Sequence, residues 1–213
     1  MIDKAKLGFW ELFTYFLIGL LITVFITVYA IQFDYVSWAK VVKNTKDSGA
    51  VGVVFSPILF LIIGLVFEPF SNYFLDFIEK LPFLKRRESR GVAALFPLVA
   101  PHLPASLGER QRFRYCKAVV EQNFPNSNLS VFLARFGFYR SLGMLMLLLF
   151  PITLFFIKIT IFSALTSSIY LILSFIFIKR AQSFKGHMEY EAFFNFIAYK
   201  ENVIFKGNNL QNP

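Results

Sequence analysis

Cationic side chains recur at helical spacing in the middle of the chain, where they can hold an anion. Arg110, Arg114 and Lys117 are three or four residues apart and therefore share one face of a helix. Guanidinium and ammonium groups aligned in this way clamp phosphates. Two other interpretations stay open: a solvated face of an amphipathic helix, and an anchor on anionic lipid. The predicted ligand-binding residues are Arg110, Arg114, Lys117, Arg112, Arg86 and Arg87.

Polar residues inside apolar stretches form the second group of candidates. Glu68 follows the apolar stretch that begins at Val51, and acids within such stretches usually face a bundle interior or water. A position at the level of the lipid headgroups is the alternative for Glu68. Ser163, Thr166 and Ser167 cluster in a later apolar stretch, where they line a polar path or hydrogen-bond between helices.

Enzymatic chemistry has one candidate pair. Arg180 and His187 are separated by six residues, a spacing that resembles the signature of HEPN-type ribonucleases. That family usually has a polar residue after the arginine, whereas this chain has Ala181. The sequence contains no phosphate-binding Walker loop and no cluster of His, Asp and Glu with metal-ligand spacing. We therefore predict a protein that is not an enzyme, with no metal and no cofactor.

The composition places these residues in a membrane protein. Of the 213 residues, 56% are hydrophobic and 19% aromatic, and only 16% are charged. An average soluble domain has about 25% charged residues. The single Cys116 excludes an internal disulfide.

Four apolar stretches are long enough to cross a bilayer, which takes about 20 residues. One helix over 142–178 would be about 55 Å long, nearly twice the hydrocarbon thickness. We therefore expect two spans with a turn at Lys158. The predicted class is an all-α membrane protein with two transmembrane hairpins and a basic helical module inserted between them. The spans are expected at about 9–32, 51–75, 142–157 and 161–178, within segments 1–79, 80–140, 141–179 and 180–213.

The module is expected to be helical but broken. Pro97, Pro101 and Pro104 recur too closely for one long helix. Ser106 has the spacing of a capping box with Glu109, which predicts the start of the next helix there. That helix has an apolar stripe of Phe113, Cys116, Val120 and Phe124. A second stripe after the last span is expected to pack against it: Phe184, Met188, Ala192, Phe196 and Tyr199.

The loops differ sharply in charge, and this predicts the orientation. Segment 80–140 holds eleven of the 22 Lys and Arg and only three acids. With both termini in the cytoplasm, eighteen Lys and Arg lie inside and four outside, as the positive-inside rule requires. We expect a multi-pass protein of the bacterial inner membrane with a cytoplasmic basic module.

This layout resembles the small membrane effectors of bacterial antiphage systems, the CBASS-type and Hailong-type pore proteins. The resemblance extends over the whole chain and carries no diagnostic motif. It implies a homo-oligomer, a tetramer or larger, whose pore or ion channel is gated by an anionic nucleotide or oligonucleotide from a partner signalling enzyme. Opening would depolarise the membrane. The alternatives are a non-catalytic anchor or accessory protein that binds anionic lipid or a partner protein, and a membrane-bound HEPN-like ribonuclease.

Overall fold

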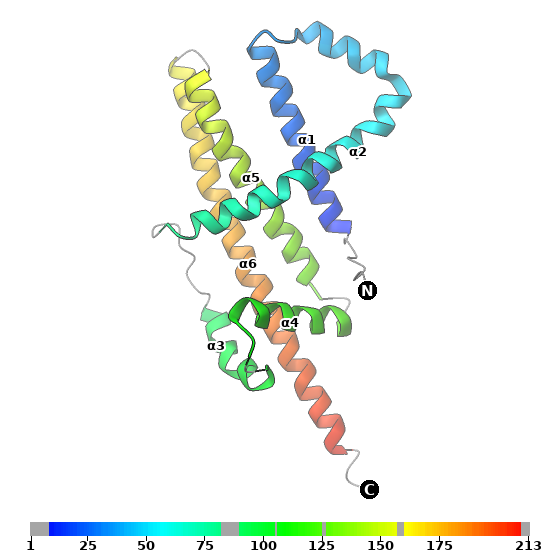
Figure 1. Ribbon diagram of the computed structural model, residues 1–213, viewed down its shortest axis with the longest axis vertical. Coiled ribbons are helices and arrows are strands. Elements are labelled where there is room, and N and C mark those ends of the chain that lie inside the picture. The colour runs from blue at the N-terminus through cyan, green and yellow to red at the C-terminus, as the bar shows by residue number, and fades with distance from the viewer. Residues whose placement is uncertain (1–8, 82–89, 105, 125–126, 157–159, 210–213) are drawn as a thin grey trace. The chain divides into compact units, whose positions relative to one another are not determined.

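The computed structural model describes residues 9–81, 90–104, 106–124, 127–156 and 160–209 (Figure 1). Within these ranges every regular element is a helix, which confirms the predicted all-α class. Four of the helices are long and apolar enough to cross a membrane, as predicted: α1, α2, α5 and α6. The elements are α1 (Phe9–Gln32), α2 (Trp38–Ile78), α3 (Arg90–Val99), η1 (Ala100–His102), α4 (Glu109–Asn123), α5 (Leu129–Phe156) and α6 (Ile161–Asn209).

Helix α2 begins earlier than the predicted span at 51–75. It starts at Trp38, because Ser37 acts as N-cap and its hydroxyl accepts a hydrogen bond from the Lys40 amide. The helix is interrupted at Gly49, whose φ of 49° and ψ of −137° are not helical. The residues expected to form an external loop are therefore largely helical, and Gly49 separates them from the apolar part of α2.

Helices α5 and α6 are longer than the spans they contain. Helix α5 continues through position 140 and α6 through position 179. The helices are therefore unbroken at the predicted boundaries between the second transmembrane hairpin and the segments on either side of it. The two helices are distinct, as expected, although Lys158 at the predicted turn lies outside the described residues.

The prediction of Ser106 as an N-cap is wrong. Helix α4 begins at Glu109 with Gly108 as N-cap, and the Gly108 amide donates to Gln111 Oε1 instead.

Residues 1–85 and 134–181 form one compact unit, called unit 1. Leu145, Met146 and Leu149 of α5 are its central side chains, and residues from α1, α2 and α6 pack against them. Helices α1 and α2 approach closely at two glycines. A Cβ at Gly19 would overlap the carbonyl oxygen of Phe60, and one at Gly64 would overlap that of Tyr15. Small residues at such a crossing are typical of helices packed in lipid.

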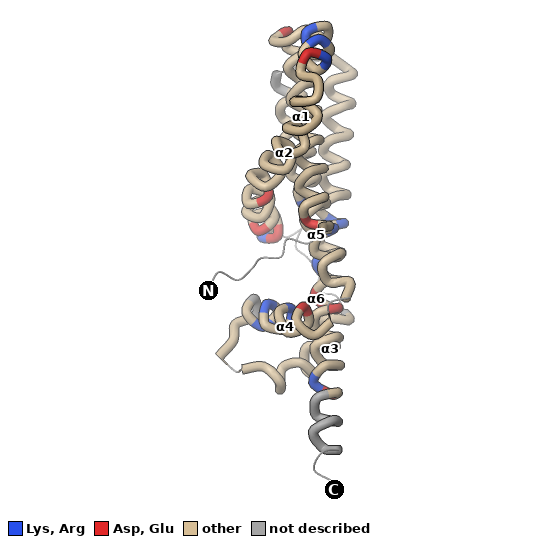
Figure 2. Tube along the Cα trace, turned by 90° about the vertical axis from the view of Figure 1, so that its right-hand side faces the viewer, with Lys and Arg blue, Asp and Glu red and all other residues tan. Residues whose placement is uncertain are grey.

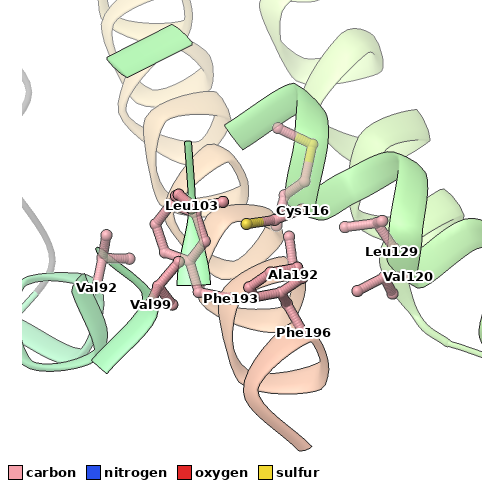
Figure 3. Close-up of a cluster of buried hydrophobic side chains, with 10 residues drawn as sticks. Val92, Val99, Leu103, Cys116, Val120, Leu129, Ala192, Phe193 and Phe196 are labelled. Carbon is pink, nitrogen blue, oxygen red and sulfur yellow. The ribbon is translucent and has the colours of Figure 1, made fainter. Parts of the chain in front are cut away.

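Residues 86–133 and 182–213 form the second compact unit, called unit 2. Its core combines α3, α4, the start of α5 and the C-terminal part of α6 (Figure 3). The predicted packing of the two apolar stripes is confirmed, because Cys116 and Val120 of α4 share this core with Met188, Ala192 and Phe196 of α6.

Large apolar side chains also remain exposed on the helices of unit 1. Phe55 of α2 is 62% exposed and Ile176 of α6 is 50% exposed, and many neighbours resemble them. Figure 2 shows long stretches of these helices without charge. Apolar surface of this extent is unfavourable in water and fits a lipid environment.

Candidate functional site

An ion pair joins α2 to α5 inside unit 1. Arg140 Nη2 donates to Glu68 Oε1 at 2.5 Å. The Arg140 side chain is only 4% exposed, and that of Glu68 is 26% exposed. Both residues belong to helices that are long and apolar enough to cross a membrane. Charges at such positions are costly and therefore need partners.

The remaining nitrogens of Arg140 have acceptors on α2. Nε donates to Ser71 Oγ at 3.1 Å, and Nη1 donates to Asn72 Oδ1. Asn72 Nδ2 in turn donates to Glu68 Oε1 at 2.7 Å. Glu68, Ser71 and Asn72 are three and four residues apart, so one face of α2 presents all three to the guanidinium.

Helix α5 completes the surroundings of this guanidinium. The Arg140 Cζ lies 4.9 Å from the centroid of the Phe136 ring, one helical turn earlier. The Ser141 and Ser71 hydroxyls share a hydrogen bond of 3.1 Å. We call Glu68, Ser71, Asn72, Phe136 and Arg140 the α2–α5 charge cluster. Because a guanidinium keeps its proton in proteins, the cluster is suited to holding two helices in register rather than to acid–base catalysis.

Of the two charged residues, only Glu68 was a candidate from the sequence, because Arg140 lies just before the predicted span at 142–157. A usable signal existed, because α5 contains no Asp or Glu. A buried cation on such a helix must find its counter-ion on another helix, and Glu68 follows the apolar part of α2 at a corresponding depth. What the sequence does not supply is the side-by-side placement of α2 and α5.

The three predicted polar residues Ser163, Thr166 and Ser167 lie near the start of α6. Thr160 is the N-cap of α6, because its Oγ1 accepts a hydrogen bond of 3.2 Å from the Ser163 amide, and the Ser163 hydroxyl accepts one of 2.9 Å from the Thr160 amide in return. Ser167 follows one turn later, buried, and within the described residues its Oγ has no hydrogen-bond partner. Thr166 is half-buried. Elsewhere in unit 1 the Tyr29 and Thr153 hydroxyls bond across α1 and α5.

The predicted anion-binding residues of α4 differ in their environments. Arg114 is exposed. Arg112 Nε donates to the Leu107 carbonyl at 2.8 Å, and its guanidinium lies 5.5 Å from the centroid of the Phe96 ring. Lys117 pairs with Glu121 at 3.5 Å. Arg86, Arg87 and the side chain of Arg110 lie outside the described residues.

Cys116 lies on the neighbouring apolar face of α4 and is fully buried. Burial raises the pKa of its thiol to about 12, because the thiolate would lose its hydration. The thiol is therefore an inert part of the core of unit 2.

The pair that resembles a ribonuclease signature lies on α6. Both Arg180 and His187 are exposed, and they are about two helical turns apart. The His187 ring lies 5.7 Å from the Phe132 ring, in a stacked arrangement. No cluster of three or more His, Cys, Asp and Glu suited to a metal occurs among the described residues.

Comparison with known proteins adds no relative to this picture. The chain matches no protein-family model, no curated protein and no solved structure. Its function is therefore argued from the two units and their charged groups.

Proposed function

We propose that the chain is a multi-pass protein of the bacterial inner membrane that oligomerises into a pore or ion channel. In this proposal α1 with α2 and α5 with α6 form two hairpins, and unit 2 is the cytoplasmic sensor of an anionic nucleotide or oligonucleotide. Ligand binding opens the pore and depolarises the membrane. The setting in antiphage defence, with a signalling enzyme as partner, follows only from the resemblance in layout.

The observation that carries the proposal is a separately packed unit, with ten Lys and Arg against six acids, on a chain with four membrane-length helices. Unit 2 has its own core, and α4 buries Cys116 and Val120 in it. The adjacent face of α4 carries Arg114, which is exposed, together with the predicted partners Arg110 and Lys117. Helices α5 and α6 both contribute residues to both units, so a change in one unit has two covalent routes to the other.

The exposed apolar faces of unit 1 support assembly. Four helices per chain enclose little space of their own, so a pore requires several copies around a symmetry axis. The apolar side chains on α2 and α6 supply contact surface for lipid and for neighbouring copies. Glu68, which is partly exposed, is then the acid available to such a pore.

The experiment is ion or dye flux from vesicles that contain the full chain, with nucleotides and oligonucleotides added outside and inside. Arg110→Glu with Arg114→Glu is expected to abolish ligand-induced flux while insertion into the vesicles is retained. Lys185→Glu with Lys200→Glu makes the same change in net charge on unit 2 and is expected to leave gating intact. A normal ligand response in the arginine variant would remove the proposed clamp.

A non-catalytic anchor or accessory protein is the second candidate, and one observation favours it. Arg112 is held by Leu107 and Phe96, and Lys117 is paired with Glu121. These contacts within unit 2 leave fewer cations for a nucleotide and suit a surface for anionic lipid or a protein. A purified chain that stays monomeric and conducts nothing with any ligand would favour this function.

A further inference from the structure

A short helical segment with its own boundaries lies between α1 and the apolar part of α2. Helix α1 ends at Gln32, and Asp34 adopts a left-handed φ of 60° while the Tyr35 amide donates to the Ala30 carbonyl. Ser37 starts the next helix, and Gly49 interrupts it. The 38–48 segment is therefore a distinct piece of α2, connected at both ends to stretches long enough to cross a membrane.

The 38–48 segment is amphipathic. Trp38, Val42 and Thr45 lie on one side, since they are three or four residues apart. Three lysines lie on the neighbouring and opposite sides, and all three are exposed: Lys40, Lys43 and Lys46. Trp38 is itself 66% exposed. A short helix with an aromatic apolar side and a lysine-rich polar side is typical of helices that lie in the membrane interface.

One side of this segment is hollowed. An open hollow of about 490 Å³ is lined by Trp38, Ala39, Val42, Lys43, Lys46 and Asp47. Its lining combines two lysines and one aspartate, a net positive charge, with an indole ring and two aliphatic side chains. Ammonium groups bind phosphate as point charges, and indole rings favour the headgroup level of a bilayer.

We propose that the 38–48 segment lies in the membrane interface and that its hollow binds the headgroup of an anionic phospholipid. The stretches at both of its ends are membrane-length helices, which keep the segment close to the bilayer surface when they are inserted. The non-helical backbone at Gly49 allows the axis to turn from the surface into the bilayer. A lipid fits better than a second copy of the segment, whose lysines would repel one another. The inference rests on membrane insertion and not on the proposed channel or its ligand.

Trp38 provides the test, because the chain has only one other tryptophan, Trp10. The full-length Trp10→Phe variant is inserted into vesicles of phosphatidylcholine, with and without phosphatidylglycerol, and insertion is checked by flotation. Nitroxide lipids labelled near the headgroup are expected to quench Trp38 fluorescence more than lipids labelled at mid-chain. Phosphatidylglycerol is expected to increase the shallow quenching. Lys43→Gln with Lys46→Gln is expected to abolish that increase, and Lys80→Gln with Lys185→Gln is expected to preserve it.

Other outcomes overturn the inference. Free quenching by aqueous acrylamide without quenching by lipid labels would place the segment in water. Protection from both would mean that protein covers it, and strongest quenching at mid-chain would place it in the hydrocarbon. A response that ignores phosphatidylglycerol, or that both lysine pairs reduce equally, would remove the headgroup site. Ion flux is measured on the same vesicles, so failure of the channel proposal is distinguished from failure of this one.

Discussion

At the scale of single residues, Arg140 is the side chain that joins α5 to α2 by hydrogen bonds and an ion pair. Its guanidinium is nearly buried, and three of its nitrogens donate to Glu68, Ser71 and Asn72 of one helix. Removing one partner of a buried pair leaves an uncompensated charge, whereas removing both partners does not. The α2–α5 charge cluster should therefore behave as a coupled unit.

Arg140→Ala is expected to lower the free energy of unfolding by about 3–5 kcal/mol, because Glu68 is left without its counter-ion. Arg140→Met combined with Glu68→Leu should recover most of this loss. The measurement is unfolding in detergent by titration with SDS, followed by far-ultraviolet circular dichroism. Ser141→Ala serves as a control, since it removes one hydrogen bond and should cost only about 1 kcal/mol. A double variant as unstable as Arg140→Ala would contradict the coupling.

Cys116 makes a prediction for unit 2 because its pKa is raised to about 12 by burial. Near pH 7 the thiol is protonated in both the folded and the unfolded chain, so its stability contribution does not vary there. Above the unfolded pKa of about 8.5 only the unfolded chain loses the proton. Stability should then fall by up to about 1.4 kcal/mol per pH unit until the folded pKa is reached.

The same burial predicts slow alkylation of Cys116. At pH 8 iodoacetamide should modify the folded chain several orders of magnitude more slowly than the denatured chain, since the thiolate is the reactive form. Cys116 is the only cysteine, so total incorporation of label reports this site alone. Rapid labelling of folded protein would show that the core of unit 2 is open.

At the scale of helices, the crossing of α1 and α2 depends on the absence of side chains at two positions. Gly64→Ala places a Cβ against the Tyr15 carbonyl, so the helices must separate, and we expect a loss of about 1–3 kcal/mol. Gly137 of α5 is the matched control, because nothing lies within 4 Å of a Cβ there. Gly137→Ala should instead stabilise the helix by up to about 1 kcal/mol. Equal effects of the two substitutions in the SDS titration would refute the close crossing.

Helix type and approximate position were predictable from the sequence, and helix ends were less so. Long apolar runs predict the membrane-length helices. The stripe of Cys116 and Val120 predicts the buried face of α4, because buried positions on a helix repeat every three or four residues. The Ser106 prediction failed because the Leu107 amide donates to the Pro104 carbonyl in a turn before α4, and the extended residue at the start of the helix is Gly108, with Gln111 in the capping contact. The early start of α2 was not predicted, because a lysine-rich segment such as 38–48 is also typical of a loop. Only the spacing of its lysines indicates a helix.

The candidate site was only half predictable. Glu68 is conspicuous as an acid beside an apolar run, but its pairing with Arg140 is a tertiary contact between helices far apart in the sequence. Arg112 was likewise predicted to bind an anion, whereas in the structure it donates to the Leu107 carbonyl and lies over the Phe96 ring. Hydrophobic periodicity fixes which face of a helix is buried and carries no information about which polar groups meet there.

At the scale of the whole molecule, the proposed topology rests on charge, and it makes a prediction of its own. Eighteen Lys and Arg fall on one side of the proposed spans and four on the other, which predicts that unit 2 faces the cytoplasm. In a Cys116→Ser background, Ser48→Cys and Ser183→Cys introduce thiols at two exposed positions, one on each proposed side. Neither substitution adds or removes a charge, so the distribution of Lys and Arg that sets the orientation is unchanged.

A membrane-impermeant maleimide added to intact spheroplasts should label the cysteine at position 48 and not the one at position 183. Permeabilising the membrane should expose position 183 to the same reagent. Labelling of both positions in intact spheroplasts would place both on the outer side of the membrane. The proposed topology, with three spans between them, would then be wrong. The reverse pattern would invert the protein, put unit 2 outside and remove a cytoplasmic nucleotide as its ligand. Because the headgroup site at 38–48 needs only an adjacent bilayer surface, that result would leave it standing.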